Sequence, residues 1–82
     1  TLDGARVLAV SGIGEPAAFE AQLAGAGAVV EGARFADHHP YDDTDVAALL
    51  ARLSGPTLLV TTLKDAVKLG PRWPRGAPTL WY

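Results

Sequence analysis

The sequence of 82 residues contains no cysteine. This absence excludes thiol catalysis, zinc sites with cysteine ligands and stabilising disulfides, and it removes any reason to place the chain in an oxidising compartment. A domain of this size buries only about 60–65% of the surface that its unfolded chain exposes. We therefore expect one small domain, residues 1–82, whose stability comes from a single compact core.

An excess of one charge sign and a long apolar run are also missing. Seven basic side chains stand against nine acidic ones, and the basic ones are scattered between Arg6 and Arg75 rather than clustered. A nucleic-acid site needs clustered Lys and Arg, and a membrane span needs about 20 apolar residues in succession. The N-terminus also lacks the basic-then-apolar pattern of a signal sequence. We therefore expect no nucleic-acid partner and no membrane span in this chain, which we expect to be soluble.

What the chain does contain is an alternation of strand-like and helix-like segments. Short runs of β-branched and aliphatic residues predict strands at residues 6–10, 29–35, 57–61 and 79–82. The weak alternation of the second run is typical of an exposed or edge strand. The third run is continuously apolar or β-branched, which predicts a central strand covered on both faces.

Two longer helices are expected between the first three strands. The first begins at Pro16, which suits a first helical turn, and ends at Gly25 and Gly27. Its apolar residues at helical spacing are Phe19, Leu23 and Ala26. The second follows the capping side chains of residues 42–45 and ends at Ser54. Its apolar stripe consists of Val46, Leu49, Leu50 and Leu53.

A third, short helix is expected from Thr62 to Leu69. Thr62 and Asp65 resemble a capping box, in which the Thr62 hydroxyl accepts an N–H and the Asp65 carboxylate reaches back. The resulting order of elements predicts a three-layer α/β fold with a mainly parallel four-stranded sheet, helices on both faces and strand order 2-1-3-4. In such sheets, ligands meet the carboxyl ends of the strands. Residues 11–14, 36–41 and 61–64 would gather there.

The glycine-containing turn at residues 11–14 is the first of these three segments. Turns of this kind can present N–H groups to a phosphate at a helix N-terminus. Because the full G-x-G-x-x-G spacing is missing and Glu15 would repel an anion, a tight structural turn is the favoured interpretation. No Walker A motif occurs in the chain, which therefore has no site of its own for the phosphates of ATP.

The second segment contains Asp37, His38 and His39, followed by Pro40. Imidazole and carboxylate groups are competent metal ligands, but neighbouring residues of an extended segment point to opposite sides. Composition alone favours a loop in which Asp37 accepts a backbone N–H and Pro40 stiffens the turn. The sharper alternative is that one histidine orients or tunes a carboxylate or a substrate hydroxyl supplied from outside this chain.

The third segment, with Thr61, Thr62 and Lys64, ends a strand and begins a helix. Its hydroxyls and its ammonium group are able to contact a phosphate. Capping already accounts for Thr62, and Lys64 and Lys68, at positions i and i+4, are typical of a solvated helix face.

Three motifs, in this order and at this spacing, resemble the C-terminal part of tetraacyldisaccharide 4'-kinase, the lipid A kinase. They are G-I-G-E-P at 12–16 followed by Phe19, F-A-D-H-H-P-Y at 35–41 followed by Asp45, and V-T-T-L-K-D-A-V-K-L at 60–69. The run T-T-x-K-D-A-V-K-L is the most specific of them. The sequence departs from the family at Leu63, where the family usually has Glu.

The resemblance implies a transferase of lipid A and lipopolysaccharide biosynthesis. It would transfer the γ-phosphoryl group of ATP, with Mg²⁺, to the 4'-hydroxyl of tetraacyldisaccharide 1-phosphate, a lipid substrate, and so make lipid IVA. It would act as a peripheral protein on the cytoplasmic side of the bacterial inner membrane. The ATP-binding loop, the metal-binding acids and the catalytic Asp of the family lie in an N-terminal P-loop lobe of the same polypeptide. The resemblance places residues 1–82 in the smaller C-terminal lobe, which would be inactive alone and would bind no cofactor or metal.

Within this chain, the resemblance singles out His38 as the catalytic residue. His38 corresponds to the family's histidine that partners the catalytic Asp across the cleft between the lobes. Asp37 and His39 would support it, although position 39 is expected to vary. The candidates to line the cleft are Thr61, Thr62 and Lys64.

Two other classes of function stay open for this sequence. A non-enzymatic α/β docking or binding module would share the scaffold without a catalytic partner, and the fold alone does not separate it from a kinase lobe. A small metal-dependent hydrolase would use Asp37, His38 and His39 as ligands. The module predicts an independent gene of this length, and the hydrolase predicts metal that stays bound through stringent purification.

Overall fold

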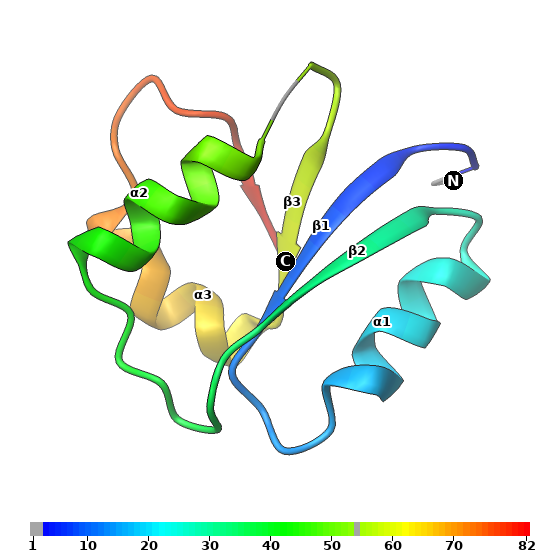
Figure 1. Cartoon of the computed structure of the whole chain (residues 1–82), viewed down its shortest axis with the longest axis horizontal. Coiled ribbons are helices and arrows are strands. Elements are labelled where there is room, and N and C mark those ends of the chain that lie inside the picture. The colour runs from blue at the N-terminus through cyan, green and yellow to red at the C-terminus, as the bar shows by residue number, and fades with distance from the viewer. Residues whose placement is uncertain (1–2, 54) are drawn as a thin grey trace.

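The computed structural model describes residues 3–53 and 55–82. In these residues, strands and helices alternate along the chain (Figure 1). The elements are β1 (Arg6–Ser11), α1 (Pro16–Gly25), β2 (Val29–Arg34), α2 (Asp43–Arg52), β3 (Leu58–Thr61), α3 (Leu63–Leu69), a 3₁₀ turn η1 (Gly70–Arg72) and β4 (Leu80–Trp81). All strand pairs are parallel and the order is β2-β1-β3-β4. The predicted three-layer α/β fold and its strand order 2-1-3-4 are confirmed.

The helices cover the two faces of the sheet unequally. In Figure 1, α1 lies on one side of the sheet, and α2 and α3 lie on the other. The main core is on the α2 and α3 side, where apolar side chains from the sheet meet both helices and the loop before α2. Its buried members are Leu8, Val10, Ala33, Tyr41, Val46, Leu49, Leu59 and Leu69.

β1 and β3 are the two inner strands of the sheet, so the predicted central position of β3 is confirmed, but β1 is the more deeply buried of the two. All residues of β1 after Arg6 are buried, as in a strand covered on both faces. In β3, Leu59 and Thr61 are buried, but Leu58 and Val60 are only partly buried. The prediction that both faces of β3 are covered was wrong, because α1 packs against β1 and β2 and leaves its side of β3 partly open.

Both longer helices begin where the sequence predicts. Pro16 is in the first turn of α1, but this helix has no fully buried residue: Phe19 is half-buried and Ala26 is exposed. The N-terminus of α2 has a complete capping box, in which Asp42 Oδ1 accepts the Asp45 N–H at 2.9 Å and Asp45 Oδ2 accepts the Asp42 N–H at 3.0 Å. Its C-terminus is at Arg52, and the predicted end at Ser54 lies outside the described residues.

The outer strand β2 is an edge strand, as predicted, and it carries charged side chains. Arg34 forms a two-pronged ion pair with Glu20 of α1, with Nε–Oε2 and Nη2–Oε1 distances of 2.9 and 2.8 Å. Glu31 pairs with Arg52 at the end of α2 (Oε2–Nη2, 3.2 Å). Ion pairs therefore connect β2 to α1 on one face of the sheet and to α2 on the other.

Candidate functional site

The loop of residues 35–42 joins β2 to α2 at the edge of the sheet where the parallel strands end (Figure 1). It is held to the last residue of β1 and to the turn that follows by two backbone hydrogen bonds. The Phe35 N–H donates to the Ser11 carbonyl at 2.8 Å, and the His38 N–H donates to the Gly12 carbonyl at 3.1 Å. The carboxyl edge of the sheet thus brings the first and second candidate segments of the sequence together, as expected.

His38 occupies an unusual backbone position in this loop. The His39 N–H donates to the Ala36 carbonyl at 3.0 Å and closes a turn in which His38 has φ of 62°. Among the described residues, it is the only one other than glycine with positive φ. Its side chain is 68% exposed, and Nε2 lies 3.7 Å from Asp37 Oδ2. Packing therefore explains neither the residue type nor its conformation.

His39 has the opposite surroundings. Its Nε2 lies 2.7 Å from Asp45 Oδ2, and its ring centroid lies 4.7 Å from that of Phe35 and 5.0 Å from that of Tyr41. The Asp42 backbone N–H, followed by the His39 side chain, holds the pKa of Asp45 below its usual range. His39 thus fastens the loop to α2 and to the aromatic part of the core.

Asp37 is half-exposed, and in the described part of the chain its carboxylate has no neighbour of opposite charge closer than the 3.7 Å contact with His38. Among the residues that the structure describes, no N–H donates a hydrogen bond to it, so the loop is closed by the backbone rather than by this side chain. Its position beside His38 leaves both side chains directed to a surface that solvent reaches.

A buried polar contact lies directly beneath this loop. Asp65, with no exposed surface, accepts hydrogen bonds at Oδ2 from the Gly12 N–H (3.0 Å) and from the Thr62 hydroxyl (2.6 Å). The Thr62 oxygen accepts the Asp65 N–H at 3.2 Å, so the predicted helix cap at Thr62 is confirmed. The carboxylate does reach back to Thr62, but it accepts from the hydroxyl of that residue and not from its backbone N–H as in a full capping box. Its Oδ2 is directed to Gly12, on the turn after β1, and to the Thr62 hydroxyl.

Gly12 is closely surrounded on its side-chain face. A Cβ at this position would lie 3.0 Å from the Ala36 carbonyl oxygen, 3.0 Å from the Tyr41 hydroxyl and 3.2 Å from Asp65 Oδ1. Burial, followed by the Asp65 charge, raises the pKa of Tyr41 well above its usual range. The Tyr41 hydroxyl and Asp65 Oδ1 have no hydrogen-bond partner among the described residues, and neither does the Ser11 hydroxyl. The turn after β1 is thus a tightly packed polar junction.

This junction also bears on the phosphate interpretation of the first segment. The Gly12 N–H is already taken by Asp65, and Glu15 precedes α1 without a capping hydrogen bond from its side chain. A turn whose amide points inward does not present that amide to a ligand. The structure favours the structural interpretation of this turn.

The third segment is divided between core and surface. Thr61 is buried and its hydroxyl donates to the Val10 carbonyl at 2.8 Å, while Thr62 is half-buried in the cap. Lys64 is exposed, and Lys68 Nζ lies 3.4 Å from the His39 carbonyl oxygen. Leu63, at the position where the family usually has Glu, is 64% exposed. Only Lys64 of the three cleft candidates has a freely exposed side chain.

Metal binding finds no support in the described residues, which contain no group of three or more His, Cys, Asp or Glu side chains placed to hold an ion. His39 is committed to Asp45, and His38 has only Asp37 nearby. The metal-dependent hydrolase therefore has no ligand set in this part of the chain.

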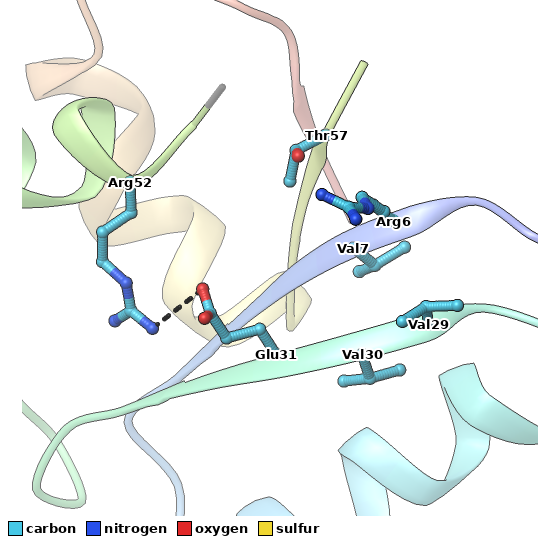
Figure 2. A pocket seen from close by; sticks show the side chains of 7 residues that line it. All are labelled: Arg6, Val7, Val29, Val30, Glu31, Arg52 and Thr57. Carbon is cyan, nitrogen blue, oxygen red and sulfur yellow. Dashed lines mark ion pairs between the residues drawn. The ribbon is translucent and has the colours of Figure 1, made fainter. Parts of the chain in front are cut away.

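A shallow hollow lies at the opposite edge of the sheet, where the strands begin. Figure 2 shows side chains from the first residues of β1 and β2, with Arg52 of α2 reaching across to Glu31. The residues that line it are Arg6, Val7, Val29, Val30, Glu31, Arg52 and Thr57. None of the sequence-predicted site residues is among them. The sequence contained no motif that would single out this hollow.

None of the helices in the described residues is long and apolar enough to cross a membrane.

A family model described as Tetraacyldisaccharide-1-P 4'-kinase matches residues 1–82. No solved structure is significantly similar to the chain.

Three curated relatives illustrate the similarity, and each is named Tetraacyldisaccharide 4'-kinase. The relative from Rhodopseudomonas palustris (strain BisA53) is 54% identical over 84% of this chain and 21% of its own length. The relative from Methylobacterium radiotolerans is 48% identical over 96% of this chain and 25% of its own length. The relative from Anaeromyxobacter sp. (strain Fw109-5) is 50% identical over 85% of this chain and 19% of its own length. The chain spans about a fifth of the length of the curated relatives it matches.

Proposed function

The chain belongs to the Tetraacyldisaccharide-1-P 4'-kinase family, and we propose that it forms the C-terminal lobe of such a kinase. The complete enzyme transfers the γ-phosphoryl group of ATP to the 4'-hydroxyl of tetraacyldisaccharide 1-phosphate and makes lipid IVA. ATP and Mg²⁺ bind in an N-terminal P-loop lobe of the same polypeptide. In this proposal the 82-residue chain is inactive alone, and the whole enzyme works as a peripheral protein on the cytoplasmic side of the inner membrane.

The position of His38 is the observation that supports this proposal most directly. Its side chain is 68% exposed at the carboxyl edge of the sheet, and its backbone has a positive φ that disfavours most side chains. Strained positions of this kind persist where the surroundings over-determine them, and they cluster at functional sites. An imidazole that contributes no core packing, in a position better suited to glycine, is well placed to meet a group outside this chain.

Phosphoryl transfer explains why an imidazole is useful in this position. Catalysis of this reaction depends on positioning and charge stabilisation, and the attacking hydroxyl must give up a proton. In the proposed enzyme, His38 hydrogen-bonds the catalytic carboxylate of the other lobe and holds it in the orientation in which it accepts that proton. Because the two groups belong to different lobes, closure of the cleft assembles them and couples substrate binding to catalysis.

The proposal is tested by replacing His38 in the full-length kinase. We expect His38→Ala to lower kcat by about 10–1000-fold, a typical range for groups that assist proton transfer, and to leave the KM for ATP nearly unchanged. The measurement is a steady-state assay with ATP and tetraacyldisaccharide 1-phosphate. An unchanged kcat would reduce His38 to a loop residue and defeat the proposal.

The neighbouring histidine provides a matched comparison of stability. His39→Ala removes the hydrogen bond to Asp45 and the ring contacts with Phe35 and Tyr41. We therefore expect it to lower the midpoint of thermal unfolding, whereas His38→Ala leaves that midpoint within a few degrees of the original. A fall in the midpoint for His38→Ala equal to that for His39→Ala contradicts the separation of the two roles.

A further inference from the structure

The buried carboxylate of Asp65 has a place in the structure that helix capping does not explain. A cap needs the Thr62 oxygen and the Asp65 N–H, and both are already used. The carboxylate itself lies 53 residues along the chain from the group it binds, the Gly12 N–H, at 3.0 Å. Burying a carboxylate is costly unless its hydrogen bonds repay the loss of water. Helix capping therefore leaves the hydrogen bond to Gly12 without an explanation.

Gly12 connects Asp65 to His38, the candidate catalytic residue, through its two peptide groups. Its N–H donates to Asp65, and its carbonyl accepts the His38 N–H at 3.1 Å. A glycine has no side chain to fix its own peptide groups, and the space where a Cβ would lie is bounded by Ala36, Tyr41 and Asp65. Asp65 thus fixes the N–H of Gly12, and the carbonyl of Gly12 fixes the backbone N–H of His38.

We propose that Asp65 is a positioning residue that holds the His38 turn in its left-handed conformation through the backbone of Gly12. The inference rests on the proposed function, because it supplies the reason why His38 must be held. Asp65 is fully buried and does not touch a substrate. A left-handed conformation at a non-glycine residue persists only where neighbouring contacts fix it. The hydrogen bond from His38 to Gly12 is such a contact, and Asp65 fixes Gly12.

The proposal makes the oxygen acceptor of residue 65, and not its negative charge, the essential feature. Oδ2 makes both hydrogen bonds, whereas Oδ1 has no partner among the described residues and lies, like the Tyr41 hydroxyl, close to the position that a Cβ on Gly12 would occupy. Asp65→Asn keeps an acceptor for Gly12 and Thr62 and places an amide donor on the side of Tyr41. Asp65→Ala removes the acceptor and leaves the Gly12 N–H unsatisfied.

The first experiment compares Asp65→Ala and Asp65→Asn in the full-length kinase. We expect Asp65→Ala to lower kcat by about 10–100-fold with the KM for ATP little changed, in line with the cost of misplacing a catalytic group by about 1 Å. We expect Asp65→Asn to keep kcat within about threefold of the original. If Asp65→Asn loses as much activity as Asp65→Ala, the charge is essential and the positioning role is wrong. Should Asp65→Ala fail to fold, the Asn variant alone decides between these outcomes.

The second experiment separates this inference from the function of His38. Hydrogen exchange, followed by mass spectrometry on the full-length protein, reports on the peptide that covers residues 36–41. We expect Asp65→Ala to speed exchange in this peptide and Asp65→Asn to leave it unchanged, because the His38 amide is bonded to Gly12. Glu31→Gln is the control and should leave exchange in this peptide unchanged, since it removes a carboxylate whose ion pair with Arg52 lies outside the loop.

The two proposals fail in different ways in these measurements. If His38→Ala leaves kcat unchanged while Asp65→Ala still speeds exchange, the proposed function is wrong and Asp65 holds a turn without a catalytic role. If His38→Ala lowers kcat but Asp65→Ala changes neither exchange nor kcat, the proposed function stands and the positioning role of Asp65 is overturned.

Discussion

The two sides of the loop at residues 35–42 differ in nearly every physical respect although they are adjacent in sequence. The outer side, Asp37 and His38, is exposed, has a single 3.7 Å contact between the two side chains and includes a left-handed backbone. The inner side, His39 and Tyr41, packs against Phe35 and reaches α2 through Asp45. Two histidines of identical chemistry are thus separated by their surroundings into one that stabilises the loop and one whose ring is exposed to solvent.

The largest effect in this comparison is expected at Tyr41, the largest fully buried side chain of the inner side. Tyr41→Ala should lower the free energy of unfolding by about 3–5 kcal/mol, the usual cost of truncating a buried aromatic residue. Urea unfolding of the 82-residue chain measures it. Tyr41→Phe is the control and should cost less than about 1 kcal/mol, because the hydroxyl has no hydrogen-bond partner among the described residues. Equal losses for the two variants would place the energy in the hydroxyl and not in the ring.

The next effect tests how tightly the residues around Gly12, beneath the outer side of the loop, are packed. Gly12→Ala inserts a methyl group at 3.0–3.2 Å from three oxygen atoms, and we expect it to cost about 1–3 kcal/mol of folding stability, as overpacking does. Gly25→Ala, where nothing lies within 4 Å of the added carbon, should be neutral or stabilise by up to about 1 kcal/mol. Circular dichroism during thermal unfolding compares the two variants. A harmless Gly12→Ala would mean that the junction beneath His38 is loosely packed.

A smaller effect concerns the tie between the inner side and α2. Since the pKa of Asp45 is lowered in the folded state, its ionised form adds stability above the unfolded pKa of about 4, and this stability is lost as the pH falls through the folded pKa. Because the pair is partly exposed, the contribution should stay below about 1 kcal/mol. We expect Asp45→Asn to unfold with a shallower dependence on pH between about 5 and 2. Denaturation curves across that range measure the difference, and parallel curves would argue against it.

The smallest effect on stability is expected on the outer side itself. His38→Gly relieves the left-handed strain but gives the unfolded chain more freedom, so the free energy of unfolding should change by less than about 1 kcal/mol. The same assay on His39→Gly should show a clear loss, because the ring contacts disappear. A destabilisation of several kcal/mol by His38→Gly would mean that the outer side carries hidden packing.

Much of the fold could be predicted from local patterns. The apolar run at residues 6–10 became the buried β1, and the aspartates at 42–45 became the complete cap of α2. These signals depend on neighbouring residues only, so the sequence displays them directly. The exposure of β3 could not be predicted in the same way, because it depends on where α1 lies. The position of α1 is determined by β1 and β2, against which it packs, and not by residues 57–61.

The candidate site was predictable in its location and less so in its internal contacts. The meeting of residues 11–14 with residues 36–41 follows from the parallel sheet, whose strands end at a common edge. The assignment of His39 to packing required the positions of Phe35, Tyr41 and Asp45 in space. The contact between Asp65 and Gly12 joins residues far apart in sequence, and a local capping motif offered a simpler interpretation of the same side chain. The catalytic role of His38 stays a prediction.

The charged residues of β2 have a consequence for how molecules of this kind meet each other. A strand at the border of a sheet offers unpaired peptide groups to any neighbouring chain, and burying Glu31 and Arg34 against an incoming strand would strip both of water. Their ion pairs with Arg52 and Glu20 keep these charges fixed along the border. These charges disfavour the pairing of a strand from another molecule with β2, and so disfavour aggregation at this border of the sheet.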